Sequence, residues 1–201
     1  MRIEQQEIEY AINKAQELSE YHKLKYLGHD NPIKSIDDLT EICTDYLNKK
    51  VKCLEHPMPS DGSYVKGFFV AYDSEYEIVL LSGLNPCWLR LVKTKELFHV
   101  VMDKEEYRNP SIAELINEVT VSFPVYDSQP ATYAASEFLT EIAAMEYLFP
   151  YTERVSLLNQ LNNVNLDFYS IALSRKLPRI LIEKYLSGSM MAALEPCYTK
   201  K

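Results

Sequence analysis

Residues 95–99, Lys-Glu-Leu-Phe-His, have the types and the spacing that could carry out chemistry. In zinc hydrolases with a His-Glu-x-x-His motif, two histidines four residues apart bind the metal from one face of a helix. The glutamate of that motif acts as general base toward the metal-bound water. This segment has the glutamate as Glu96 and the second histidine as His99, but Lys95 occupies the position of the first histidine. The segment therefore indicates a hydrolase-type metal site that lacks one ligand.

A hairpin and a helix must position this segment. Aromatic and β-branched residues on both sides of a polar turn at 73–75 predict a β-hairpin over residues 64–81. Gly83, Asn85 and Pro86 end that hairpin, and residues 88–102 then predict the helix that carries Lys95 and His99. A short strand is expected at 51–54, and further helices at 3–27, 36–47, 112–119, 132–149, 152–161, 166–174 and 179–186.

This order of elements predicts an α+β fold, with a small early sheet followed by a mostly helical half. The 201 residues and an average globular composition predict a single domain over 1–201. The four cysteines form no Cys-x-x-Cys pair, so we expect buried thiols rather than a zinc ribbon or a disulfide scaffold. No secretory signal or membrane-spanning run is present in the sequence, which predicts a cytoplasmic protein without membrane contact.

The surroundings of residues 95–99 resemble the ImmA/IrrE family of metallopeptidases over most of the chain. In that family a similar hairpin precedes an arginine and the metal-binding helix, which matches Arg90 and residues 95–99 here. A later helix of the family carries Glu-Ala-Asn-x-Phe-Ala-Ala-x-Leu-Leu-Met-Pro, which resembles residues 139–150, Leu-Thr-Glu-Ile-Ala-Ala-Met-Glu-Tyr-Leu-Phe-Pro. A helix-turn-helix-like tail in family members resembles residues at about 166–187. The resemblance implies a zincin-like fold and a third metal ligand from the later helix.

The candidate ligands are fewer than a catalytic zinc site needs, since such a site takes three protein ligands and one open position. His99 is one candidate, and either Glu137 or Glu141 on the later helix is another; these two lie one helical turn apart, so the sequence does not choose between them. The Lys95 ammonium has no lone pair with which to bind a metal. We hypothesise that it takes the place of the cation and pairs with the carboxylate, so that Glu96 is a vestigial base.

Other interpretations of the charged residues stay open. Glu96, His99 and Asp103 lie at i, i+3 and i+7, a spacing that could hold a weakly bound divalent ion, although a solvated helix end explains the acidic residues better. The remaining histidines, His22, His29 and His56, have no metal-ligand spacing to one another and are expected at the surface.

Three functions follow from these observations, and the first is favoured. It is a catalytically impaired metallopeptidase-like protein without a cofactor that binds a protein partner; the resemblance implies association with phage or mobile elements and a transcription regulator as a partner. The second is an active endopeptidase that cleaves a repressor-type protein and uses zinc or another divalent ion on a rearranged ligand set. The third is a nucleic-acid module in the tail, which the net charge of −8 disfavours.

Overall fold

The computed structural model describes residues 3–26, 33–57, 66–103, 132–161 and 167–199 of the chain. Within these ranges the elements follow one another as α1 (Gln5–Lys25), α2 (Ile36–Leu47), β1 (Lys50–His56), β2 (Gly67–Ala71), β3 (Glu75–Leu81), α3 (Pro86–Val101), α5 (Thr132–Leu148), α6 (Tyr151–Leu161), α7 (Phe168–Arg175), α8 (Arg179–Tyr185), α9 (Gly188–Leu194) and α10 (Pro196–Thr199). The predicted α+β class, with a small early sheet and a mostly helical remainder, is confirmed. The helix expected at 112–119 lies outside the described residues.

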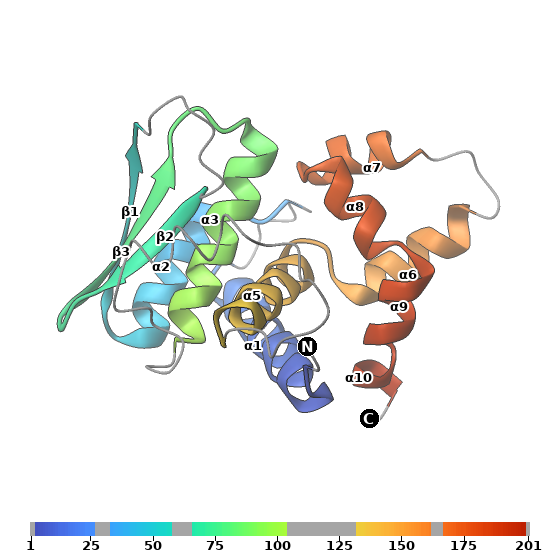
Figure 1. Cartoon of the computed structure of the whole chain (residues 1–201), viewed down its shortest axis with the longest axis horizontal. Helices are drawn as coiled ribbons and strands as arrows, with labels where there is room; N and C mark the ends of the chain where they lie inside the picture. Colours follow the sequence, from blue (N-terminus) through green and yellow to red (C-terminus); the bar gives the residue numbers. More distant parts are fainter. Residues whose placement is uncertain (1–2, 27–32, 58–65, 104–131, 162–166, 200–201) are drawn as a thin grey trace.

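The sheet has three strands in the order β1-β3-β2 (Figure 1). β2 and β3 pair antiparallel, which confirms the predicted hairpin within the described part of 64–81. The short strand expected at 51–54 is present as β1 and is longer than predicted. It pairs in parallel with β3, the second strand of the hairpin. Tyr76, Ile78 and Leu80 alternate along β3 as its buried residues and direct this face of the sheet toward the helices.

Helices α2 and α3 pack against the sheet, and α5 lies against α3 and α1 (Figure 1). The Ser35 hydroxyl accepts a hydrogen bond from Asp38 N at the start of α2, and Asn48 ends that helix in the left-handed conformation, with φ of 48°. The fully buried side chains at the centre of this packing include Leu18 of α1, Leu39 of α2, Ile78 of β3, Leu97 of α3 and Ile142 of α5. The sheet and these four helices therefore share one apolar core.

The short helices α6–α10 lie on the side of α5 away from the sheet (Figure 1). α7 and α8 are the helices expected at 166–174 and 179–186, with nearly the same bounds. The turn 176–178 between them begins with Lys176, which has a φ of 51°. The sequence patterns did not predict α9 and α10, because both helices have seven or fewer residues and show no sustained apolar period.

The four cysteines are free thiols; Cys43 is buried, as expected, whereas Cys53, Cys87 and Cys197 are partly exposed, unlike the expectation. Among residues 3–26, 33–57, 66–103, 132–161 and 167–199, no helix is both long and apolar enough to cross a bilayer.

Candidate functional site

Helix α3 carries the residues singled out above. The Asn85 side chain accepts hydrogen bonds from Cys87 N and Trp88 N, each at 3.1 Å, and Pro86 occupies the first turn, so the start of α3 is fixed by its own sequence. Lys95 and His99 lie one turn apart, and both side chains reach the same residue of α5. The helix that the sequence predicted therefore presents this pair to its neighbour α5.

Glu137 of α5 is the residue that both side chains reach. Lys95 Nζ donates to Glu137 Oε2, and His99 Nε2 lies 2.8 Å from Glu137 Oε1. The three side chains, here called the Lys95–Glu137–His99 cluster, are mostly buried, with 23%, 30% and 7% of each side chain exposed. The carboxylate thus has one oxygen on the ammonium and the other on the imidazole.

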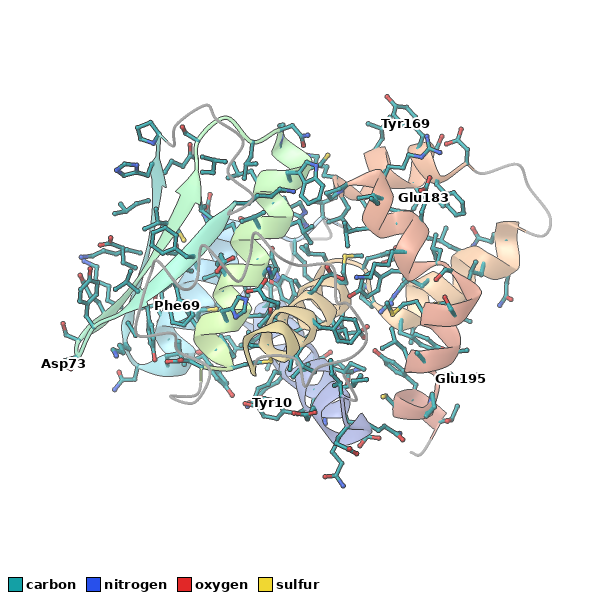
Figure 2. The ribbon with its side chains drawn as sticks, in the orientation of Figure 1. Tyr10, Phe69, Asp73, Tyr169, Glu183 and Glu195 are labelled. Carbon is teal, nitrogen blue, oxygen red and sulfur yellow. The ribbon has the colours of Figure 1, made fainter. Side chains whose placement is uncertain are left out.

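Two hydroxyl groups of α5 fix the orientation of the His99 ring. Thr140 Oγ1 lies 3.0 Å from His99 Nε2, and it donates its own proton to the backbone carbonyl of Ser136 at 2.9 Å. It therefore accepts from the ring, as Glu137 does, which assigns a proton to Nε2. On the other side of the ring, Ser136 Oγ lies 3.4 Å from Nδ1 and can donate to it. The Phe69 side chain of β2, labelled in Figure 2, stacks near the ring at a centroid distance of 6.2 Å.

The charges of the cluster reinforce one another. Burial raises the pKa of the Glu137 carboxyl, but the opposing effects of Lys95 and His99 are stronger and hold that pKa well below its usual range. Burial also lowers the pKa of Lys95, but Glu137 and Glu96 outweigh it and the pKa of Lys95 is raised. Lys95 and Glu137 are therefore an ion pair at neutral pH.

Glu96, the residue at the general-base position, is 5% exposed, and its side chain lies against β2. Its Cγ would lie 3.1 Å from a Cβ placed on Gly67, so strand and helix approach each other closely here. Burial raises the pKa of Glu96, against the lowering effects of His99 and Lys95. Within the described part of the chain, no hydrogen bond reaches its carboxyl group.

The structure keeps the other two candidate carboxylates away from the cluster. Glu141 accepts hydrogen bonds from Lys184 Nζ at 2.5 Å and from the Tyr185 hydroxyl at 3.0 Å, both on α8. Asp103 lies beyond the end of α3, so it does not continue the helical face of Glu96 and His99, and it accepts from the Tyr76 hydroxyl at 3.2 Å. Of the two carboxylates one turn apart, Glu137 alone joins Lys95 and His99.

The donor set of the cluster does not fit a zinc ion. The described residues offer two groups that could bind a metal, His99 and Glu137, and both already hydrogen-bond to other members of the cluster. The Lys95 ammonium, in contact with Glu137, would repel a divalent cation at that oxygen. Among residues 3–26, 33–57, 66–103, 132–161 and 167–199, no group of three or more His, Cys, Asp or Glu side chains could hold a metal ion.

A second polar group lies among α1, α2 and α5, and the sequence patterns missed it. The expectation that His22 is a surface residue is wrong: it is 9% exposed, its Nδ1 lies 3.1 Å from the Tyr147 hydroxyl and its Nε2 lies 3.3 Å from Asp38 Oδ2. His22 continues the buried spacing of Ala15 and Leu18 along α1, which is the signal that could have placed it. His56 is exposed, as expected, and His29 lies outside the described residues.

The comparisons with known proteins give this site no family. No protein-family model matches the chain, and no curated protein matches its sequence. The chemistry of the cluster must therefore be argued from its own residues.

Proposed function

We propose that this chain is a zincin-like scaffold in which the Lys95 ammonium takes the place of the metal, and that it acts by binding a protein and not by hydrolysing one. The observation that carries the proposal is the contact of Lys95 with Glu137, whose other oxygen meets His99. A carboxylate from the later helix and the histidine of the Glu-x-x-His segment converge, and a cation sits between the two helices. That cation is a side chain of the protein itself.

The positive charge of Lys95 neutralises the Glu137 carboxylate, which a metal ion would otherwise have to neutralise. An uncompensated carboxylate this deep in a protein is costly, and a lysine from the facing helix compensates it without any ligand. The fold around the cluster therefore stays stable without a metal, but there is no metal to polarise a water molecule for hydrolysis. Such a scaffold is suited to recognition, and the resemblance noted above makes a transcription regulator the favoured partner.

Metal content of the protein purified without chelator tests the proposal. We expect the unmodified protein to carry no stoichiometric zinc, and added Zn²⁺ or Mn²⁺ to leave its melting temperature unchanged. The variant Lys95→His supplies the missing ligand beside His99 and Glu137, so it should bind zinc; zinc at about 100 times its dissociation constant would stabilise it by roughly 2.7 kcal/mol. Lys95→Met is the matched control, because it removes the charge without adding a ligand.

Three outcomes would contradict the proposal. One tightly bound equivalent of zinc in the unmodified protein would show that Lys95 does not occupy the place of the metal. Failure of a folded Lys95→His protein to bind zinc would show that residue 95 does not stand at a ligand position. If the unmodified protein cleaved a repressor-type protein and Glu96→Gln did not, the chain would be an active endopeptidase instead.

A further inference from the structure

Helices α7 and α8 expose four large apolar side chains. Phe168, Tyr169 and Leu173 of α7 are 38%, 58% and 56% exposed, and Ile180 of α8 is 63% exposed. Figure 2 shows Tyr169 at the outer edge of the molecule. These four residues are called the α7–α8 face below. Single exposed apolar residues are ordinary, but four on two adjacent short helices are typical of an interaction surface.

The core does not account for these side chains, because the inner sides of the same helices already pack against it. Ile171, Leu177 and Ile182 are at most 3% exposed and belong to the common apolar core. Both helices are therefore apolar on two sides, whereas a surface helix needs only one apolar side. Leu173 lies in the last turn of α7 and Ile180 in the first turn of α8, on either side of the turn 176–178.

The two helices are held in fixed positions. Asp167 caps α7 by accepting from Ser170 N at 2.6 Å, and Arg175 near the other end forms an ion pair with Glu153 of α6. Lys184 of α8 binds Glu141 of α5. The α7–α8 face is therefore preorganised, and a partner would not have to pay for ordering it.

Charge separates this part of the molecule from the rest. Residues 167–201 contain six Lys and Arg against three Asp and Glu, although the whole chain carries a net charge of −8. Lys176 in the turn is exposed and makes no ion pair with any described residue. Arg179 beside Ile180 is 62% exposed and forms an ion pair with the exposed Glu183 one turn away. On the rim of the α7–α8 face, Lys176 is therefore a cation without an ion pair among the described residues, whereas Glu183 partly balances the charge of Arg179.

We propose that the α7–α8 face docks an acidic amphipathic segment of a partner protein, which deepens the protein-binding function proposed above and rests on it. Apolar residues of that segment cover Tyr169, Leu173 and Ile180, and its carboxylates meet Lys176 and Arg179. An apolar centre with a basic rim suits this occupant better than a nucleic acid, whose phosphates need polar donors rather than leucine and isoleucine. Two copies of this chain would bring the same basic rims together in a twofold contact.

Selection of peptides from a random display library on the full-length protein tests the proposal. The selected peptides are synthesised with a fluorescent label and measured by fluorescence polarisation. We expect them to combine Leu, Ile or Phe with Asp or Glu, and to bind at least tenfold more weakly to Leu173→Asp/Ile180→Asp. Lys176→Glu/Arg179→Glu should weaken them in a salt-dependent way. Leu24→Asp is the matched control, since Leu24 of α1 is a leucine outside the face and is even more exposed, at 70%.

An unchanged melting temperature shows that each variant is folded. The proposal is overturned if the selected peptides bind Leu173→Asp/Ile180→Asp as tightly as the unmodified protein, or if selection yields no binding peptide. It is also overturned if the same variant loses binding of a duplex DNA oligonucleotide, or dissociates a dimer in sedimentation, while peptide binding persists. Metal content is the independent readout of the function proposed for Lys95, so failure of the docking face and failure of that function are distinguishable.

Discussion

Glu137 shows how much one carboxylate contributes to this molecule. Replacing it with Gln keeps its shape and removes its charge, so Lys95 stays charged without its partner. Because both side chains are less than one third exposed, we expect a loss of about 1–3 kcal/mol in the free energy of unfolding near neutral pH. The pKa of Glu137 is lower in the folded state than in the unfolded state, so this contribution is present above about pH 4.5 and is lost as the pH falls through the folded-state pKa.

Urea unfolding of the unmodified protein and Glu137→Gln between about pH 3 and 7 measures this effect. The difference between the two proteins should shrink as the solution is acidified. Glu17→Gln is the control: Glu17 is exposed and pairs with Lys14 on the same helix, so this variant should differ little from the unmodified protein. A difference that stays constant with pH for Glu137→Gln would contradict the ion pair.

Lys34 makes the opposite contribution, because its ammonium is partly buried and no carboxylate of the described residues hydrogen-bonds to it. Its Nζ donates to Ser19 Oγ at 2.8 Å and to the Tyr147 carbonyl at 2.7 Å. Burial, together with Lys23 and Arg90, lowers the pKa of Lys34 to about 8. Above that pH the folded protein has released the proton that the unfolded chain still binds, so stability should rise between about pH 8 and 10.5, by up to about 3 kcal/mol.

Lys34→Met removes the titrating group, so the rise should be absent from its unfolding curves over the same pH range. Lys50→Met, at an exposed lysine that begins β1, is the control and should follow the unmodified protein. Tyrosines and cysteines are common to all three proteins, so their contribution to the pH dependence of stability cancels in the comparison. Equal slopes for Lys34→Met and the unmodified protein would show that Lys34 is not the group responsible.

At the level of elements, the contact between β2 and α3 depends on Gly67. A Cβ at this position would lie 2.9 Å from Val92 Cγ1, 3.1 Å from Glu96 Cγ and 3.2 Å from Leu80 Cδ2. Gly67→Ala should therefore separate strand from helix and reduce the free energy of unfolding by about 1–3 kcal/mol. Gly188→Ala, where a Cβ would meet nothing within 4 Å, should leave stability unchanged in the same urea titration. Equal stability of the two variants would contradict the close approach.

Breaking the buried ion pair between α5 and α6 should reduce the free energy of unfolding by more than Gly67→Ala does. Arg154 is 1% exposed and donates to Glu146 at 2.7 Å, and Glu146 also accepts from Tyr151 N at the start of α6. Arg154→Met leaves a buried carboxylate unpaired and should cost about 3–5 kcal/mol of unfolding free energy. Combining it with Glu146→Gln should recover part of that loss in a double-mutant cycle measured by urea unfolding. Additive losses would show that the two groups act independently.

The sequence predicted most elements of the fold and two of the three residues of the Lys95–Glu137–His99 cluster, and left the third undecided. Lys95 and His99 could be placed on one face because the helix that carries them follows from its cap and its apolar spacing. The choice between Glu137 and Glu141 could not be made, because it depends on how α5 turns toward α3 and on which residues of α8 reach it. The parallel pairing of β1 with β3 was likewise missed, since local patterns contain no information about pairing between distant strands.

At the scale of the whole molecule, Glu141 joins the C-terminal helices to the rest of the protein. It accepts from Lys184 and from the Tyr185 hydroxyl, and the Tyr185 side chain is fully buried. Glu141→Ala leaves that hydroxyl without its acceptor, so α8 should open more readily, with a fall of about 1–2 kcal/mol in its opening free energy. The amides of α3 and β3 do not depend on this contact and should keep their protection.

Native-state hydrogen exchange measured by NMR or mass spectrometry distinguishes the two regions. Glu183→Gln is the control, because Glu183 lies on the same helix and its ion-pair partner in the described part of the chain is the exposed Arg179, so its loss should change the opening free energy of α8 by less than about 0.5 kcal/mol. Equal loss of protection in α8 and in α3 after Glu141→Ala would show that the sheet and the C-terminal helices unfold as one cooperative unit. A selective loss in α8 would show that the helices carrying the proposed docking face can open while the Lys95–Glu137–His99 cluster stays intact.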